Sequence, residues 1–167
     1  MSKNAGRVVE WSSKNLPELR KQYRQREQVV QVTRALDPKV EFSDAMDALL
    51  SLLQEAGIEV LVLGQPVLWK EEMTPAEAAT LWLPVNTQLG PVRPPTAWML
   101  TEMRRYNDAQ KRIAARHGAA YVDLDSEVPK TLEYYFDDCH YTDAGSSLVA
   151  SVVFSALKNQ MRLMAPK

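Results

Sequence analysis

The sequence has little that would suit an oxidising compartment or a membrane. Cys139 is the only cysteine among 167 residues, so the chain cannot form an internal disulfide. No apolar run approaches the roughly 20 residues that a membrane-spanning helix needs. Residues 1–10 also lack the apolar stretch of a signal peptide. These absences predict a cytoplasmic protein with no membrane span, and secretion stays open if a leader precedes residue 1.

An excess of charge of one sign is lacking too. Lysine and arginine together number 20 against 21 acidic residues, which gives a formal net charge of −1. This balance predicts no binding to nucleic acid, and the basic residues between 20 and 26 are interpreted as a solvated helix face. RNA binding has only that helix in its favour. The two histidines fall in no cluster with metal-ligand spacing, so we predict neither a metal nor a cofactor.

The patterns that are present indicate an α/β fold. Apolar residues at helical spacing predict helices over residues 15–36, 43–56, 96–117 and 143–164. Short apolar runs predict buried strands at 58–63 and 119–124, with 7–11 as a weak third. Because helices and strands alternate, we predict a parallel sheet with crossover helices. An ordinary sheet has about five strands, so we expect one partial domain over 1–167 that lacks its first strands.

The segment 65–95 separates the first convincing strand from the next long helix. It holds six of the ten prolines and two of the four tryptophans, and Thr74 and Pro75 predict a short helix over 74–81 inside it. Long connections are often functional, and open α/β sheets bind ligands where their strands end. The segment is therefore interpreted as a pocket rim, with an extra structural layer as the alternative. Trp69 and Trp82 would then contact substrate, or else pack against the core.

The two histidines differ in their sequence context. His117 ends a predicted helix, where a cation interacts favourably with the helix dipole, so we interpret it as a surface residue. His140 follows Asp137 by three residues, in a loop before the last helix. A carboxylate in that place can accept the imidazole Nδ1–H and direct Nε2 toward a serine hydroxyl. This spacing favours Asp137 as an orienting acid and His140 as a general base.

A longer pattern surrounds this pair and extends from about Phe42 to Leu157. Its motifs are Tyr134-Tyr135-Phe136-Asp137-Asp138-Cys139-His140-Tyr141-Thr142, Tyr106-Asn107, Val122-Asp123-Leu124, Val128-Pro129 and Val60-Leu61-Val62-Leu63-Gly64-Gln65-Pro66. In these motifs the sequence resembles the SGNH (GDSL-type) hydrolases. The resemblance implies a three-layer, flavodoxin-like parallel sheet. It also implies hydrolysis of carboxylic esters by serine acyl transfer, with Asp137 and His140 in the roles given above.

The departures from that family concern the nucleophile. The family's serine lies in a Gly-Asp-Ser motif and its oxyanion hole uses an asparagine of a Gly-x-Asn block, and this sequence contains neither. The nucleophile is therefore unknown. Cys139 is interpreted as a structural thiol, Asp138 as solvated or capping a turn, and Asp143 as the N-cap of the last helix.

Two accounts of the function remain open. In the first, the chain is part of an esterase that acts on an acyl lipid or an acylated sugar, and is inactive by itself because the nucleophile is missing. In the second, it is a non-catalytic binding protein that retains part of the fold. A homo-oligomer or a partner chain would supply the missing strands in either case, because an open sheet edge favours association.

Overall fold

The structure is a computed structural model that describes residues 16–26, 41–83, 85–87 and 90–164. Its long helices are α1 (Leu16–Gln25), α2 (Glu41–Glu55), α4 (Thr96–Arg116) and α6 (Asp143–Met164). Two short helices are α3 (Pro75–Ala78) and α5 (Leu124–Glu127). The strands are β1 (Leu61–Leu63), β2 (Val85–Thr87), β3 (Gly90–Val92) and β4 (Ala120–Val122). None of the helices in these ranges is long and apolar enough to span a membrane.

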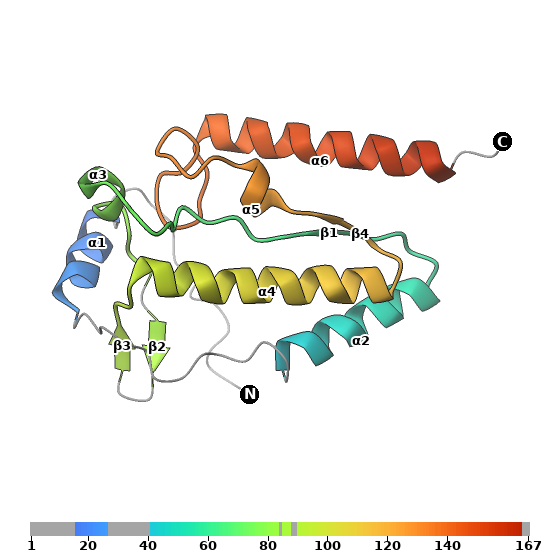
Figure 1. The fold of residues 1–167 in the computed structure, drawn as a ribbon, viewed down its shortest axis with the longest axis horizontal. Coiled ribbons are helices and arrows are strands. Elements are labelled where there is room, and N and C mark those ends of the chain that lie inside the picture. The colour runs from blue at the N-terminus through green and yellow to red at the C-terminus, as the bar shows by residue number, and fades with distance from the viewer. Residues whose placement is uncertain (1–15, 27–40, 84, 88–89, 165–167) are drawn as a thin grey trace, which may run out of the picture.

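The strands β1 and β4 form a parallel pair at the centre of the domain. Leu61 lies opposite Ala120 and Leu63 lies opposite Val122, and the Gly64 N–H extends the ladder to the Val122 carbonyl at 2.9 Å. Figure 1 shows α6 on one side of this pair and α4 with α2 on the other. The predicted α/β class and parallel pairing are therefore confirmed, with two strands in the parallel sheet among the described residues.

Each strand of the pair follows a helix that ends at a glycine. Gly57 after α2 and Gly118 after α4 have φ values of 70° and 64°, which side chains other than glycine's rarely adopt. The left-handed residue reverses the chain and lets it enter the strand directly. Apolar residues of α2, β1 and α4 then pack together as a cluster of Leu50, Val62, Ile113 and Ala114. The predicted helices over 43–56 and 96–117 agree with this structure within two residues at each end.

Several predicted bounds need correction. The strands β1 and β4 are three residues long instead of six, and Ile58, predicted to lie in a buried strand, is 53% exposed. The helix predicted over 74–81 is shortened to α3, which begins with the predicted Thr74 cap and is closed by a capping box with Glu77. The antiparallel hairpin of β2 and β3 and the short helix α5 were not predicted. Residues 7–11 and 27–36 lie outside the described residues.

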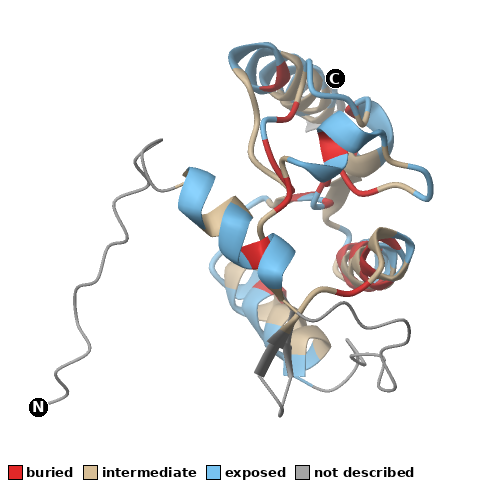
Figure 2. Ribbon diagram, turned by 90° about the vertical axis from the view of Figure 1, so that its left-hand side faces the viewer, coloured by how far each residue is buried: buried red, intermediate tan, exposed pale blue. Residues whose placement is uncertain are grey.

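A second apolar cluster lies beside the first turns of α4 and continues into the loop that precedes α6. It includes Val67, Leu68 and Tyr135, and α1 contributes its only buried residue, Tyr23. Figure 2 shows this one buried position in red on α1, whose other residues are exposed or intermediate. Helix α6 has three large apolar side chains that are exposed. Phe154 is 66%, Leu157 43% and Met161 72% exposed. The apolar spacing of this helix had predicted that Leu157 faces inward, and that prediction was wrong.

Candidate active site

The predicted pair lies in a narrow loop between residues 134 and 142. The Thr142 N–H donates to the Tyr134 carbonyl at 3.0 Å, and the Phe136 N–H donates to the His140 carbonyl at 3.1 Å. These two bonds close the loop and leave residues 137–139 at its tip. An Asp at the start of such a tip can accept hydrogen bonds from backbone N–H groups that follow it. The chain thus reverses direction between Asp137 and His140.

Helix α6 begins directly after this loop. The Thr142 hydroxyl accepts the Gly145 N–H at 3.1 Å, so Thr142 caps the helix and the prediction of Asp143 as the cap was wrong. A Cβ atom at Gly145 would lie 2.1 Å from the Tyr134 carbonyl oxygen. Only glycine therefore fits where the helix start crosses the loop, and this close contact fixes the loop relative to α6.

Asp137 and His140 form a close pair in which the acid is buried and the histidine is accessible. The Asp137 side chain is 0% exposed and the His140 side chain is 38% exposed. His140 Nδ1 lies 2.9 Å from both carboxylate oxygens. The backbone N–H groups of His140 and Cys139 donate to Asp137 Oδ1 at 2.9 and 3.1 Å. These donors fix the direction of the Asp137 carboxylate, and a carboxylate in this place can orient an imidazole through its Nδ1.

Two aromatic rings lie nearly parallel to the imidazole. The Trp82 ring is inclined to it by 8° with centroids 6.3 Å apart, and the Phe136 ring by 19° with centroids 5.7 Å apart. Trp82 also donates its indole Nε1–H to Asp137 Oδ2 at 2.9 Å. The segment 65–95 therefore reaches the histidine through Trp82.

Asp138 is buried instead of solvated, so that interpretation was wrong. Its side chain is 0% exposed. It accepts the Trp69 Nε1–H at 2.8 Å on Oδ1, and the Trp82 and Leu83 backbone N–H groups at 2.7 and 3.2 Å on Oδ2. Burial raises the pKa of the Asp138 carboxyl above its usual range, and the N–H donors of Trp82 and Trp69 act in the opposite direction. The two adjacent aspartates thus share Trp82 as a donor, and Asp137 alone contacts the imidazole of His140.

Cys139 does not have the environment of a nucleophile. Burial, followed by the charges of Asp137 and Asp138, raises the pKa of its thiol to about 12. Its Sγ lies 3.8 Å from His140 Nδ1. Within the described part of the chain, Asp137, Cys139 and His140 are the one set of at least three His, Cys, Asp and Glu residues whose ligand atoms gather, all within 4.8 Å. A protonated thiol is a poor metal ligand, and the Asp137 oxygens already accept N–H donors.

The segment that leaves β1 is held in place by side chains from two helices. Asn107 of α4 accepts the Gln65 N–H at 2.8 Å and donates to the Gln65 carbonyl at 2.9 Å. Asp125 of α5 accepts the Val67 N–H at 3.1 Å, and the Lys130 ammonium donates to the Val67 carbonyl at 2.6 Å and to Asp125. These contacts hold the backbone of Gln65 and Val67, the residues that lead from β1 toward Trp69.

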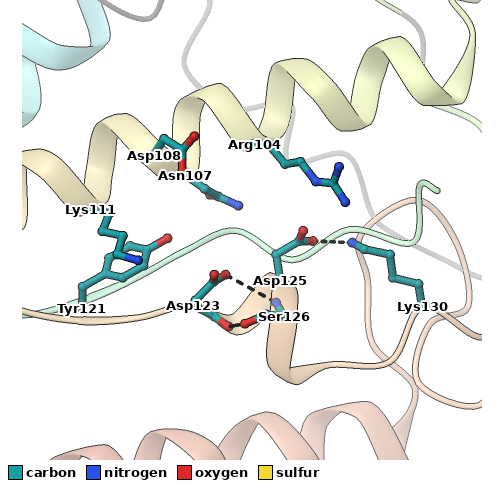
Figure 3. Close-up of a pocket in the computed structure, with 9 residues that line it drawn as sticks. All are labelled: Arg104, Asn107, Asp108, Lys111, Tyr121, Asp123, Asp125, Ser126 and Lys130. Carbon is teal, nitrogen blue, oxygen red and sulfur yellow. Dashed lines mark hydrogen bonds and ion pairs between the residues drawn. The ribbon is translucent and has the colours of Figure 1, made fainter. Parts of the chain in front are cut away.

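A polar hollow of about 300 Å³ lies beside these contacts, between α4 and α5. Figure 3 shows Arg104 and Asp125 pointing toward one another from the two helices, with Lys130 bonded to Asp125. Its lining residues are Arg104, Asn107, Asp108, Lys111, Tyr121, Asp123, Asp125, Ser126 and Lys130. No residue of the 134–142 loop or of the segment 65–95 lines it, so this hollow is separate from the histidine.

The basic helix α1 also contributes to the site. Arg20 donates to the Thr80 carbonyl at 3.1 Å and to the Phe136 carbonyl at 2.8 Å. It therefore links α1 to the end of α3 and to the residue before Asp137. The sequence had indicated a solvated helix face for the basic residues of α1, and for Arg20 that interpretation was wrong. Helical spacing predicted the helix but gave no signal for a partner 116 residues away.

The structure brings some of the predicted site residues together and separates others. Asp137, His140 and Trp82 contact one another, and Trp69 is joined to them through Asp138. Trp69 is only 9% exposed. A substrate contact for the two tryptophans stays a prediction. His117 lies apart from this site, at the end of α4, with Nε2 3.0 Å from Oδ1 of Asp47 in the middle of α2.

A parallel pair of strands flanked by helices defines an α/β domain, and the loop before its last helix places a buried carboxylate 2.9 Å from a histidine Nδ1. The chain belongs to the SGNH family, because residues 8–154 match a family model described as the SGNH domain that is fused to AT3 domains. The match begins well before Phe42, where the resemblance described above begins. No curated protein matches the chain.

Proposed function

We propose that Asp137 and His140 are the acid and base of a serine acyl-transfer site that hydrolyses carboxylic esters. The observation that carries this proposal is the contact of a buried carboxylate with Nδ1 of an accessible histidine, at 2.9 Å. In such a pair the carboxylate fixes the tautomer and stabilises the imidazolium. Nε2 then removes the proton from a serine hydroxyl during attack and returns it to the leaving alcohol.

The serine of this mechanism comes from outside residues 1–167 in our proposal. Without a nucleophile and an oxyanion hole, an acid–base pair forms no acyl-enzyme, and each lost element costs orders of magnitude in rate. The chain alone is then catalytically silent. The complete domain has the three-layer, flavodoxin-like fold of its family, with its first strands supplied from outside these residues. The substrate is an ester of an acyl lipid or an acylated sugar, and the cytoplasmic location stays a prediction.

A non-catalytic interaction role is the second candidate, and the exposed apolar side chains favour it. Leu63 on β1 is 38% exposed, and Phe154 and Met161 on α6 are 66% and 72% exposed. Isolated exposed apolar residues are common, but several on neighbouring elements favour association with another surface. A second copy of the chain, or the polypeptide that carries the serine, would cover them.

The test is labelling by a fluorophosphonate, which reacts readily with an activated serine, and peptide mapping identifies the modified residue. Residues 1–167 are compared with the longest polypeptide that the natural gene encodes, by intact mass and then peptide mapping. We expect no adduct on residues 1–167, and one adduct on the longer polypeptide that disappears in His140→Ala. His117→Ala removes the other histidine, and we expect it to label normally.

Each other outcome of this test counts against part of the proposal. An adduct on residues 1–167 would show that the nucleophile lies within them. An adduct on the longer polypeptide that survives His140→Ala would remove His140 from the mechanism. No adduct on the longer polypeptide would favour the non-catalytic candidate.

A further inference from the structure

Trp82 is held by one aspartate and in turn contacts its neighbour. Its backbone N–H donates to Asp138 Oδ2 at 2.7 Å, and its indole Nε1–H donates to Asp137 Oδ2 at 2.9 Å. The two aspartates are adjacent in sequence, whereas Trp82 lies 55 residues before Asp137. This one residue therefore joins the segment 65–95 to the carboxylate that faces the histidine.

The indole contact limits the rotation of the Asp137 carboxylate. Oδ1 accepts the backbone N–H groups of His140 and Cys139, and Oδ2 accepts the indole of Trp82. With donors on both oxygens, rotation about the Cβ–Cγ bond would break at least one hydrogen bond to a buried charge. The lone pairs that face His140 Nδ1 are thereby held in one direction. The indole ring also lies nearly parallel to the imidazole, inclined by 8° with the ring centroids 6.3 Å apart.

Asp138 determines where this indole lies. It accepts the N–H groups of two consecutive residues, Trp82 and Leu83, and also the Trp69 indole at 2.8 Å. Two consecutive backbone N–H groups directed at one carboxylate set the path of the chain at Trp82. Because Asp138 is 0% exposed, water does not readily replace it as the acceptor.

We infer that Trp82, anchored through its backbone by Asp138, is a positioning residue for the Asp137–His140 pair. The inference rests on the proposed function. In this role Trp82 needs no contact with substrate. Asp138 influences the orientation of His140 indirectly, because it fixes the backbone of Trp82, whose indole bonds to Asp137. The segment 65–95 then takes part in orienting the histidine.

The exchange of the His140 Nδ1–H proton with water, observed by NMR, reports this positioning directly. A proton shared with a buried carboxylate exchanges slowly, and loosening of the pair exposes it. His140→Gln identifies its signal. The chain contains an internal reference, because His117 also contacts a carboxylate, Asp47, at 3.0 Å. The signals of His117 should not change in any of the variants below.

Three variants separate positioning from general packing. Trp82→Phe removes the indole donor to Asp137 and keeps an aromatic ring, and we expect Nδ1–H exchange to accelerate about tenfold or more. Asp138→Asn keeps an oxygen for the Trp82 backbone N–H but replaces a charged acceptor by a weaker neutral one. We expect exchange to change in the same direction as in Trp82→Phe, by a smaller factor. Trp69→Phe is the matched control, because it removes a similar donor from Asp138 and not from Asp137. We expect its exchange to stay within about twofold of the unmodified chain.

The outcomes distinguish this inference from the proposed function. Unchanged exchange in a Trp82→Phe variant that still unfolds cooperatively would overturn the inference and leave the Asp137–His140 pair intact. An effect of Trp69→Phe as large as that of Trp82→Phe would also overturn it, because general loosening would then explain both. If His140→Gln removes no protected proton from the spectrum, the pair itself does not form and the proposed function fails.

Discussion

Replacing Asp138 by alanine tests whether the buried carboxylate holds the segment 65–95 in place. The side chain is 0% exposed and accepts N–H groups from Trp69, Trp82 and Leu83. Asp138→Ala leaves all three donors without this acceptor. A buried donor without a partner costs about 1–3 kcal/mol, so the loss amounts to at least about 3 kcal/mol.

One term opposes this loss. Removing the carboxylate also removes the cost of burying its charge, which is the cause of its raised pKa. We therefore expect the free energy of unfolding to fall by about 3–5 kcal/mol, against a total of about 5–15 kcal/mol for an ordinary domain. Asp138→Asn keeps an acceptor for the Trp82 and Leu83 N–H groups and loses the one for Trp69. We expect its cost to be smaller, about 1–2 kcal/mol.

Urea unfolding, followed by tryptophan fluorescence and by far-ultraviolet circular dichroism, measures both values. Asp108→Ala on the exposed side of α4 is the control, and we expect it to change the free energy by no more than about 0.5 kcal/mol. A loss below about 1 kcal/mol for Asp138→Ala, with an unchanged denaturant dependence, would refute the reasoning. It would mean that the three donors have other acceptors.

Two further predictions concern ionisable groups. Because the Cys139 thiol has its pKa raised from 9.0 to about 12, we expect alkylation of the folded chain at pH 8 to be about a thousandfold slower than that of the unfolded chain; equal rates in native buffer and in urea would contradict this. Hydrogen bonds from His117 and Arg116 lower the pKa of Asp47 below its usual 3.8. Its stabilising effect is therefore present above pH 3.8 and lost as the pH falls through the lower folded value. Melting temperatures should differ between the unmodified chain and Asp47→Asn at pH 7 and converge in acid, whereas a constant difference would argue against the contact.

Local patterns were sufficient to predict the long helices α2, α4 and α6 and the contact of Asp137 with His140. Gly57 and Gly118 end two helices where the apolar periodicity stops, and both have the positive φ that such ends require. Asp137 and His140 are three residues apart, so the loop alone brings them together. No long-range information was needed for these features.

Contacts between distant residues explain the features that the sequence did not predict. Asp137 and Asp138 are the same residue type in the same loop, and what distinguishes them is the position of Trp69, 69 residues from Asp138. Likewise, nothing in the local sequence distinguishes Arg20 from the other basic residues of α1, because its partner is the distant Phe136 carbonyl. Strand length also depends on the partner strand, so apolar runs overestimated β1 and β4.

The contacts of the two aspartates depend on the number of residues in the tip of the loop between Phe136 and His140. Asp137 reaches back to the histidine and Asp138 reaches out to Trp69 and Trp82, because successive side chains point in different directions. Inserting or deleting one residue between Phe136 and His140 would exchange these directions, even if both carboxylates remained. Homologous chains that keep both aspartates and the histidine should therefore keep the number of residues between Phe136 and His140 constant.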